Sequence, residues 1–123
     1  MIKRIVVAGS RNFNEYSVAK KYIDACIKDL KNSCTFIFVS GTCKGADLLG
    51  EKYAIENGFE IERYPAQWNI YGRGAGIRRN EQMAQVSDIV ICFWDGKSKG
   101  TKSMIELAKK NNKTIYIKLV ETL

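Results

Sequence analysis

Short apolar segments alternate with amphipathic segments along this chain. The apolar segments are rich in β-branched and aromatic residues, which favour strands, and they lie at residues 4–8, 35–39, 59–64, 88–94 and 114–119. The segments between them repeat their apolar residues at helical spacing and predict helices over residues 14–31, 46–57, 77–86 and 101–111. Strands that alternate with helices are typical of an α/β domain with a mostly parallel sheet. We therefore predict one such domain over residues 1–123, with about five strands and four helices.

Two strands and two helix ends allow sharper predictions. Residues 59–64 alternate charged with apolar side chains, which places this strand at an edge of the sheet. Residues 88–94 are almost wholly apolar and predict a central strand that is buried on both faces. Asn14 is a residue type that caps helices and is expected to start the first one, and Gly58 is placed to end the second.

The composition excludes several classes of protein and of site. Twenty Lys and Arg against 13 Asp and Glu give a net charge of +7, which favours anionic partners. No apolar run reaches the roughly 20 residues that cross a bilayer, so no membrane partner is expected. Histidine is absent, which removes the commonest general base and most transition-metal sites, and we predict neither a metal nor a cofactor. The four cysteines show no C-x-x-C spacing and are interpreted as reduced thiols of a cytoplasmic protein.

Glycine stands beside cations or hydroxyls at the end of each of the first four predicted strands. In an open parallel sheet, ligands bind beyond the carboxyl ends of the strands, where the strand order reverses. Helices that begin in such loops present free N–H groups and a partial positive charge, which bind phosphate. The four segments are Gly9–Arg11, Ser40–Asp47, Pro65–Asn80 and Asp95–Thr101.

The segment Pro65–Asn80 looks the least like part of a core. It contains two aromatic rings, then glycines, then two arginines and an amide. We predict a loop that approaches an anionic ligand with a ring. Glycine admits close backbone contact, arginine binds phosphate, and aromatic rings stack on a base. A surface loop with solvated arginines is the alternative interpretation.

Candidate site residues come from these four segments and from two helices. The predicted ligand-binding residues are Gly9, Ser10, Arg11, Gly41, Thr42, Lys44, Gly45, Asp47, Trp68, Tyr71, Arg78, Arg79, Asn80, Gly96, Gly100 and Thr101. Asp47 has two interpretations, because it can stabilise the N-terminus of its own helix or accept hydrogen bonds from a ribose. Glu81 and Glu106 are the carboxylates expected early in helices that face the site, and each is a candidate general acid or base. The glycine spacings match neither a P-loop nor the G-x-G-x-x-G dinucleotide motif.

Five motifs lie along the chain: Val7–Arg11, Ser40–Asp47, Pro65–Trp68, Tyr71–Gly76 with Arg79 and Asn80, and Phe93–Thr101 with Met104 and Ile105. Taken together, they resemble the YspA-like branch of the SLOG superfamily, which includes the DNA-processing protein Smf/DprA and the lonely-guy phosphoribohydrolases. The resemblance covers nearly the whole chain. It implies a Rossmann-like three-layer sandwich, a site for a nucleotide-derived ligand such as an ADP-ribose-like molecule, and a bacterial or phage origin.

One departure from the superfamily bears on activity. Lonely-guy enzymes carry a P-G-G-x-G-T-x-x-E signature and use an arginine and a glutamate to cleave a base from ribose phosphate. Here Gly100 and Thr101 match, but the Pro-Gly-Gly start is absent and Glu106 lies five residues after the threonine instead of three. This departure argues against hydrolysis of a glycosidic bond.

Three functions are therefore ranked. Binding of a nucleotide-derived molecule, for sensing or sequestration, comes first because phosphate-binding groups are abundant and catalytic candidates are few. An N-glycosidic hydrolase of nucleoside monophosphates comes second, with Arg79 holding the phosphate and Glu81 or Glu106 assisting the leaving base. Single-stranded nucleic-acid binding comes third, because no aromatic-studded groove is evident. A homodimer or higher homo-oligomer is an expectation only.

Overall fold

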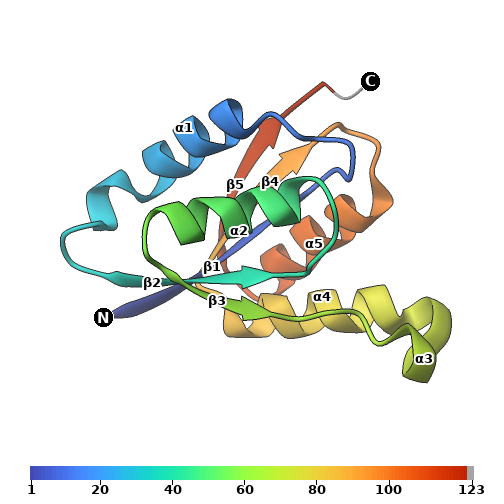
Figure 1. The fold of residues 1–123 in the computed structure, drawn as a ribbon. Coiled ribbons are helices and arrows are strands. Elements are labelled where there is room, and N and C mark those ends of the chain that lie inside the picture. The colour runs from blue at the N-terminus through green and yellow to red at the C-terminus, as the bar shows by residue number, and fades with distance from the viewer. Residues whose placement is uncertain (122–123) are drawn as a thin grey trace.

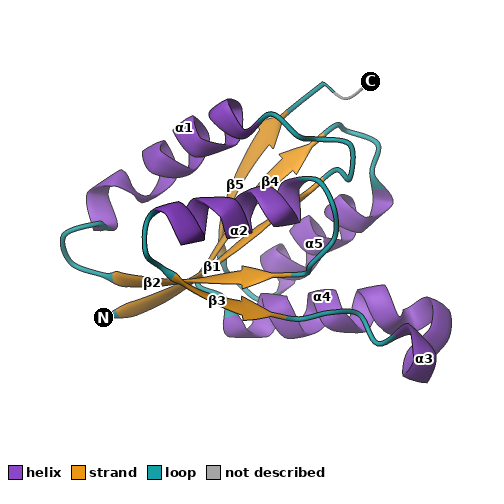
Figure 2. Ribbon diagram, in the orientation of Figure 1, coloured by secondary structure: helices purple, strands orange, loops and turns teal. Residues whose placement is uncertain are grey.

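The computed structural model describes residues 1–121 and contains one five-stranded sheet. All pairs of neighbouring strands are parallel, and the strand order is β3-β2-β1-β4-β5 (Figures 1 and 2). The chain runs outward from β1 through β2 to β3, then crosses to the other side of β1 and continues through β4 to β5. The strands are β1 (Ile2–Gly9), β2 (Thr35–Ser40), β3 (Glu60–Arg63), β4 (Ile89–Trp94) and β5 (Thr114–Leu119).

Helices cover both faces of the sheet and make a Rossmann-like three-layer sandwich (Figure 2). Helices α1 (Tyr16–Ile27) and α2 (Ala46–Glu56) lie on one face, and α4 (Ala75–Val86) and α5 (Lys99–Lys110) lie on the other. A further short helix, α3 (Trp68–Tyr71), is a single turn that precedes α4 in the chain, as Figure 1 shows. Short 3₁₀ turns follow α1 at Lys28–Leu30 and join α3 to α4 at Gly72–Gly74.

The central strand β1 divides the core into two halves. Ile5 and Val7 pack against α1 and α2, whereas Val6 and Ala8 pack against α4 and α5. Successive side chains of a strand point to opposite faces, so a strand that is covered on both sides must be apolar at every position. This explains the continuous apolar runs at residues 5–8 of β1 and over the whole of β4.

The prediction that residues 59–64 form an edge strand is confirmed, and so is the internal position of the strand at 88–94. Gly58 follows α2 with a left-handed backbone (φ +72°), as expected for a helix-ending glycine. The prediction for Asn14 is wrong. The helix begins one residue later than expected, at Tyr16, and no side chain caps it. The hydroxyl of Tyr16, the first residue of the helix, donates a 2.8 Å hydrogen bond to Glu56 on α2.

The predicted loop at residues 65–76 is also partly wrong. Helix α3 and the 3₁₀ turn occupy residues 68–74, and α4 begins at Ala75 rather than Ile77. Ala75 is fully buried, and its burial stabilises the first turn of α4. Separately, none of the helices in residues 1–121 is long and apolar enough to cross a membrane.

Candidate functional site

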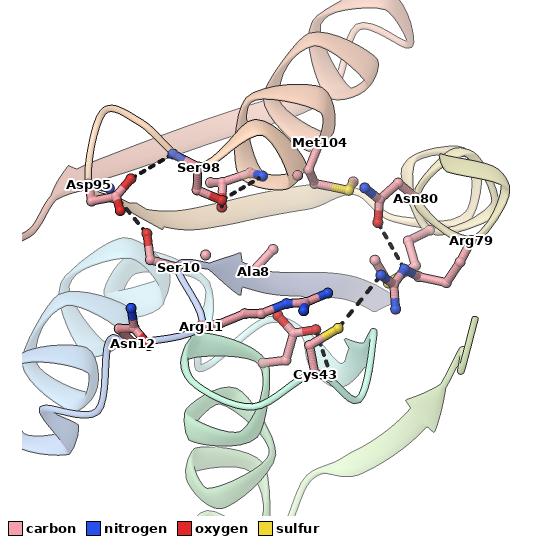
Figure 3. A pocket seen from close by; sticks show the side chains of 15 residues that line it. Ala8, Ser10, Arg11, Asn12, Cys43, Arg79, Asn80, Asp95, Ser98 and Met104 are labelled. Carbon is pink, nitrogen blue, oxygen red and sulfur yellow. Dashed lines mark hydrogen bonds between the residues drawn. The ribbon is translucent and has the colours of Figure 1, made fainter. Parts of the chain in front are cut away.

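A cavity of about 340 Å³ lies where the strand order reverses, between the carboxyl ends of β1 and β4 (Figure 3). The loops after these two strands diverge toward opposite faces of the sheet, which leaves a crevice between them. Its lining comes from the loops after β1, β2 and β4 and from helices α2, α4 and α5. The lining residues are Ala8, Gly9, Ser10, Arg11, Asn12, Cys43, Asp47, Arg79, Asn80, Met83, Asp95, Ser98, Gly100, Thr101 and Met104.

Ser10 ties together the three loops that form the cavity. Its backbone N–H donates to the carbonyl of Phe93 (3.0 Å), and its own carbonyl accepts from the N–H of Ala46 (3.4 Å). Its hydroxyl oxygen accepts a hydrogen bond from the N–H of Asp95 (3.3 Å). One buried serine therefore sets the spacing between the ends of β1 and β4 and the start of α2.

Glycine permits the close approach of these loops at Gly45. Its backbone has φ +86°, a left-handed conformation that L side chains rarely adopt. A Cβ atom there would lie 2.4 Å from the carbonyl oxygen of Ser10 and 2.6 Å from that of Arg11. Gly45 thus lets the N-terminus of α2 sit directly against the loop that carries Arg11.

The start of α5 forms the opposite wall of the cavity. Ser98 caps this helix, because its hydroxyl accepts from the N–H of Thr101 (3.4 Å) and from the Thr101 hydroxyl (3.1 Å). The Asp95 carboxylate accepts from the N–H groups of Lys97 and Ser98, both at 2.8 Å, and holds the preceding turn. The N-terminus of a helix carries a partial positive charge, so this wall favours an anion.

Two guanidinium groups face the cavity from different elements. Arg79 on α4 is only 9 % exposed, and its Nη1 donates to the carbonyl of Gly41 while its Nε donates to Asn80 Oδ1 (2.9 Å). Arg11, in the loop after β1, is exposed and extends toward Arg79 in Figure 3. Arginine donates in a planar fork that matches phosphate, so the pair supplies anion-binding groups on two sides of one hollow.

A hydrogen-bonded chain positions the loop that meets Arg79. Arg63 on β3 donates to Glu51 Oε1 through Nε (3.0 Å) and Nη2 (2.9 Å), and Ser40 donates to Glu51 Oε2 (2.6 Å). The Ser40 hydroxyl in turn accepts from the N–H of Thr42 (3.0 Å). Thr42 is held at φ +65°, which is rare for a β-branched residue, so this network maintains a strained turn beside Gly41.

Asp47 is the most buried carboxylate of the cavity, and its pKa is raised to about 6. Burial is the main cause, because it disfavours the charged form, and the charge of Glu51 adds to it. A hydrogen bond from the N–H of Cys43 (3.2 Å) and the positive charges of Arg79 and Arg11 act in the opposite direction. Asp47 therefore changes charge near pH 6.

The D47N variant is expected to remove a pH-dependent part of the stability. The folded protein binds this proton more tightly than the unfolded chain does, so the contribution of Asp47 is present below pH 3.8 and is lost as the pH rises through about 6. The free energy of unfolding of D47N minus that of the wild type should increase across this window by up to about 3 kcal/mol. Urea unfolding at pH 4, 5, 6 and 7 measures it. A difference that is constant with pH would contradict the raised pKa.

The model of the YspA, cpYpsA-related SLOG family matches residues 3–71, more than half of the chain. The chain belongs to this SLOG family. The Gene 61 protein of Mycobacterium phage D29 is 28% identical over 116 residues, which cover 89% of this chain and 90% of that protein.

Solved structures of DNA processing protein A show the same fold as this SLOG chain. The Streptococcus pneumoniae protein aligns with a TM-score of 0.70 and 20% identity over 95% of this chain. This chain spans only half of the pneumococcal protein. The Helicobacter pylori protein, whose structure concerns its single-stranded DNA binding mode, aligns with a TM-score of 0.65 and 22% identity, over 98% of this chain and 68% of its own. At these identities the likeness concerns the fold alone.

Half of the ligand-binding residues predicted from the sequence line the cavity of this SLOG domain. These are Gly9, Ser10, Arg11, Asp47, Arg79, Asn80, Gly100 and Thr101. Gly41, Thr42, Lys44, Gly45 and Gly96 lie in the surrounding loops but are not part of the lining. Trp68, Tyr71 and Arg78 lie farther along, on α3 and α4, where all three are exposed. The Arg78 guanidinium lies 4.4 Å from the centre of the Tyr71 ring.

The expectation that Glu81 and Glu106 face the site requires correction. Both are exposed, and neither lines the cavity. Glu106 instead lines a groove on α5 with Lys99, Lys102 and Lys110. Because α4 and α5 pack on each other and on the sheet, only one side of each helix reaches the crevice, and both glutamates fall on another side. The carboxylates that do line the cavity are Asp47 and Asp95.

Sequence reasoning missed several lining residues. They are Ala8, Asn12, Cys43, Met83, Asp95, Ser98 and Met104. Asp95 and Ser98 had a usable signal, because both lie within two residues of a glycine in the strand-end segment Asp95–Thr101. Met104 belongs to the motifs that carry the resemblance, which was a signal of a different kind. Met83 had none, since an apolar residue in a helix reads as core. In residues 1–121 no group of three or more Cys, Asp or Glu side chains is arranged to hold a metal ion.

Proposed function

We propose that this protein binds a nucleotide-derived small molecule through a phosphate group placed in the cavity between β1 and β4, and releases it intact. The observation that carries the proposal is the convergence of Arg11, Arg79 and the N-terminus of α5 on one hollow at the strand-order reversal. Each is a recognised phosphate-binding group, and the three come from separate segments.

The other lining groups suit the rest of a nucleotide. The volume of about 340 Å³ lies near the lower end of the roughly 300–1,000 Å³ that is usual for small-molecule pockets. The hydroxyl of Thr101 and the amide of Asn80 are suited to hydrogen-bond a sugar, and the Asp47 carboxylate would accept from a ribose hydroxyl placed beside it. Met83 and Met104 supply the apolar surface that adapts to a ring.

Binding without turnover is preferred over hydrolysis because of where the carboxylates lie. Glu81 and Glu106 do not line the cavity, so neither is placed to protonate a leaving base there. A hydrolase would have to use one of the two lining carboxylates. Asp47 is the better candidate, because its pKa of about 6 suits a general acid, whereas Asp95 accepts hydrogen bonds that hold its own turn. Release of free base from AMP by the wild type, and its loss in D47N, would support hydrolysis and overturn this proposal.

Single-stranded DNA is the second candidate partner. It is suggested by the Helicobacter pylori relative and by a lysine-lined groove on α5, formed by Lys99, Lys102 and Lys110. A polymer that follows this groove would bind more tightly as it lengthens, and its affinity would fall steeply with salt. Affinity that is independent of oligonucleotide length favours the small-molecule site.

The R11A variant is expected to lose ligand affinity without losing stability. Arg11 is exposed, so its removal leaves no buried group unpaired, but it takes away a charge-assisted hydrogen bond to phosphate. The dissociation constant for AMP or ADP-ribose, measured by calorimetry, should rise about 10- to 100-fold. The thermal midpoint of the unliganded protein should stay unchanged.

The matched control is R73A, which removes one exposed arginine from the 3₁₀ turn before α4, outside the cavity. It should bind as the wild type does. Equal weakening in both variants would mean that net charge, not the cavity, attracts the ligand. No binding of any nucleotide to the wild type would overturn the proposal.

A further inference from the structure

A second hollow of about 190 Å³ lies beyond the carboxyl end of β3. It is lined by Arg63 at the end of β3, by Tyr71 on α3, and by Arg78, Arg79 and Gln82 on α4, among others. Three arginines contribute to this lining and no carboxylate does. A surface that gathers cations without acids attracts anions.

The three arginines differ in how far their charges are already balanced. Arg63 donates twice to Glu51, so its charge is largely compensated. Arg78 stacks on the ring of Tyr71, and no ion pair to a carboxylate is found for it within residues 1–121. Stacking holds a guanidinium in place while its edge remains able to donate. Arg78 is therefore a positioned cation at the rim of this hollow.

Arg79 connects this hollow with the main cavity, because it lines both. Its Nη1 donates to the carbonyl of Gly41, which fixes the Arg79 side chain as a partition between the two hollows. A ligand that reaches over this partition would place one anionic group against Arg11 and the start of α5, and another against Arg78.

We propose that the hollow beyond β3 is a second anion-binding lobe of the ligand site, so that the natural ligand is dinucleotide-sized and carries two separated phosphate groups. This inference rests on the proposed function and deepens it. It gives a role to Tyr71 and Arg78, which the main cavity leaves unused.

Inorganic phosphate tests the lobe directly. In a titration of ¹⁵N-labelled protein at constant ionic strength, two groups of backbone amides should shift: Gly9, Ser10 and Thr101 for the main cavity, and Tyr71, Arg78 and Gln82 for the second lobe. The R78A variant should lose the second group of shifts and keep the first, while R73A should keep both.

A matched pair of ligands tests the size of the ligand. The 5′-phosphorylated dinucleotide pApA should bind at least tenfold more tightly than AMP, and R78A should abolish that gain without changing the affinity for AMP. If phosphate shifts only the main-cavity amides, or if R78A weakens the binding of AMP and of pApA alike, the proposal of a second lobe is wrong and the proposed function stands. If phosphate shifts neither group, both fail.

Discussion

Replacing Gly45 with alanine is expected to destabilise the protein more than any other single change considered. The residue combines a left-handed backbone with two carbonyl oxygens that would lie 2.4 and 2.6 Å from a new Cβ atom. Backbone strain and overpacking add together here, and we expect the free energy of unfolding to fall by about 3–5 kcal/mol. Relief of the clash requires α2 to move away from the loop after β1, so Arg11 is displaced and nucleotide affinity falls in the fraction that remains folded.

Gly58 provides the matched control for this substitution. Its backbone is also left-handed (φ +72°), but no atom lies within 4 Å of the position that a Cβ would take. G58A should therefore cost only about 1 kcal/mol, the penalty of the backbone conformation alone. Urea unfolding followed by circular dichroism measures both variants. Similar losses in the two would show that the close approach at Gly45 is not significant.

Removing Arg79 is expected to affect stability and binding together. In R79A the buried carbonyl of Gly41 loses its donor, and the nearby carboxylate of Asp47 loses a stabilising positive charge. A buried polar group without a partner is costly, and we expect the free energy of unfolding to fall by about 2–4 kcal/mol. Nucleotide binding should be undetectable, because both proposed lobes lose a phosphate-binding group.

The R79K variant separates the two effects. Lysine keeps a positive charge near Asp47, but it lacks the planar fork that donates to Gly41 and Asn80 at once. It should recover part of the stability at neutral pH and little of the affinity. Full recovery of affinity by lysine would mean that Arg79 acts as a simple charge and not through its geometry.

The fold could be predicted from the sequence because the sheet is covered on both faces. That arrangement forces the covered part of β1 (residues 5–8) and all of β4 to be apolar, whereas β3, at the edge, alternates. Both patterns are visible without coordinates. The helix boundary near Ala75 was missed because glycines surround it. In a sequence, glycine signals a loop. Here Gly74 and Gly76 lie inside a helical segment, which the burial of Ala75 stabilises.

The sequence predicts those parts of the candidate site whose position follows from the ends of the strands, and not the others. Parallel strands bring their carboxyl ends to one edge, so Ser10 lies close to the first turns of α2 and α5, which carry Asp47 and Thr101. Side chains on α4, which does not begin directly at a strand end, are different, because rotation of the helix by one residue decides whether a side chain faces the crevice. Adjacent residues on α4 show the effect: Arg78 is exposed, and Arg79 is buried against Gly41.

The strand order has a consequence for how this chain reaches its native state. Strand β1 occupies the centre of the sheet, yet its partner β4 is distant in sequence: the Arg4 N–H donates to the Asp88 carboxylate (2.8 Å), 84 residues along the chain. Closing so long a loop is entropically unfavourable and slows folding. During synthesis, β1 emerges long before β4, and one edge of the central strand stays open until β4 arrives. We expect nascent or truncated chains that lack β4 to be prone to aggregation and to depend on chaperones, although the complete domain is small.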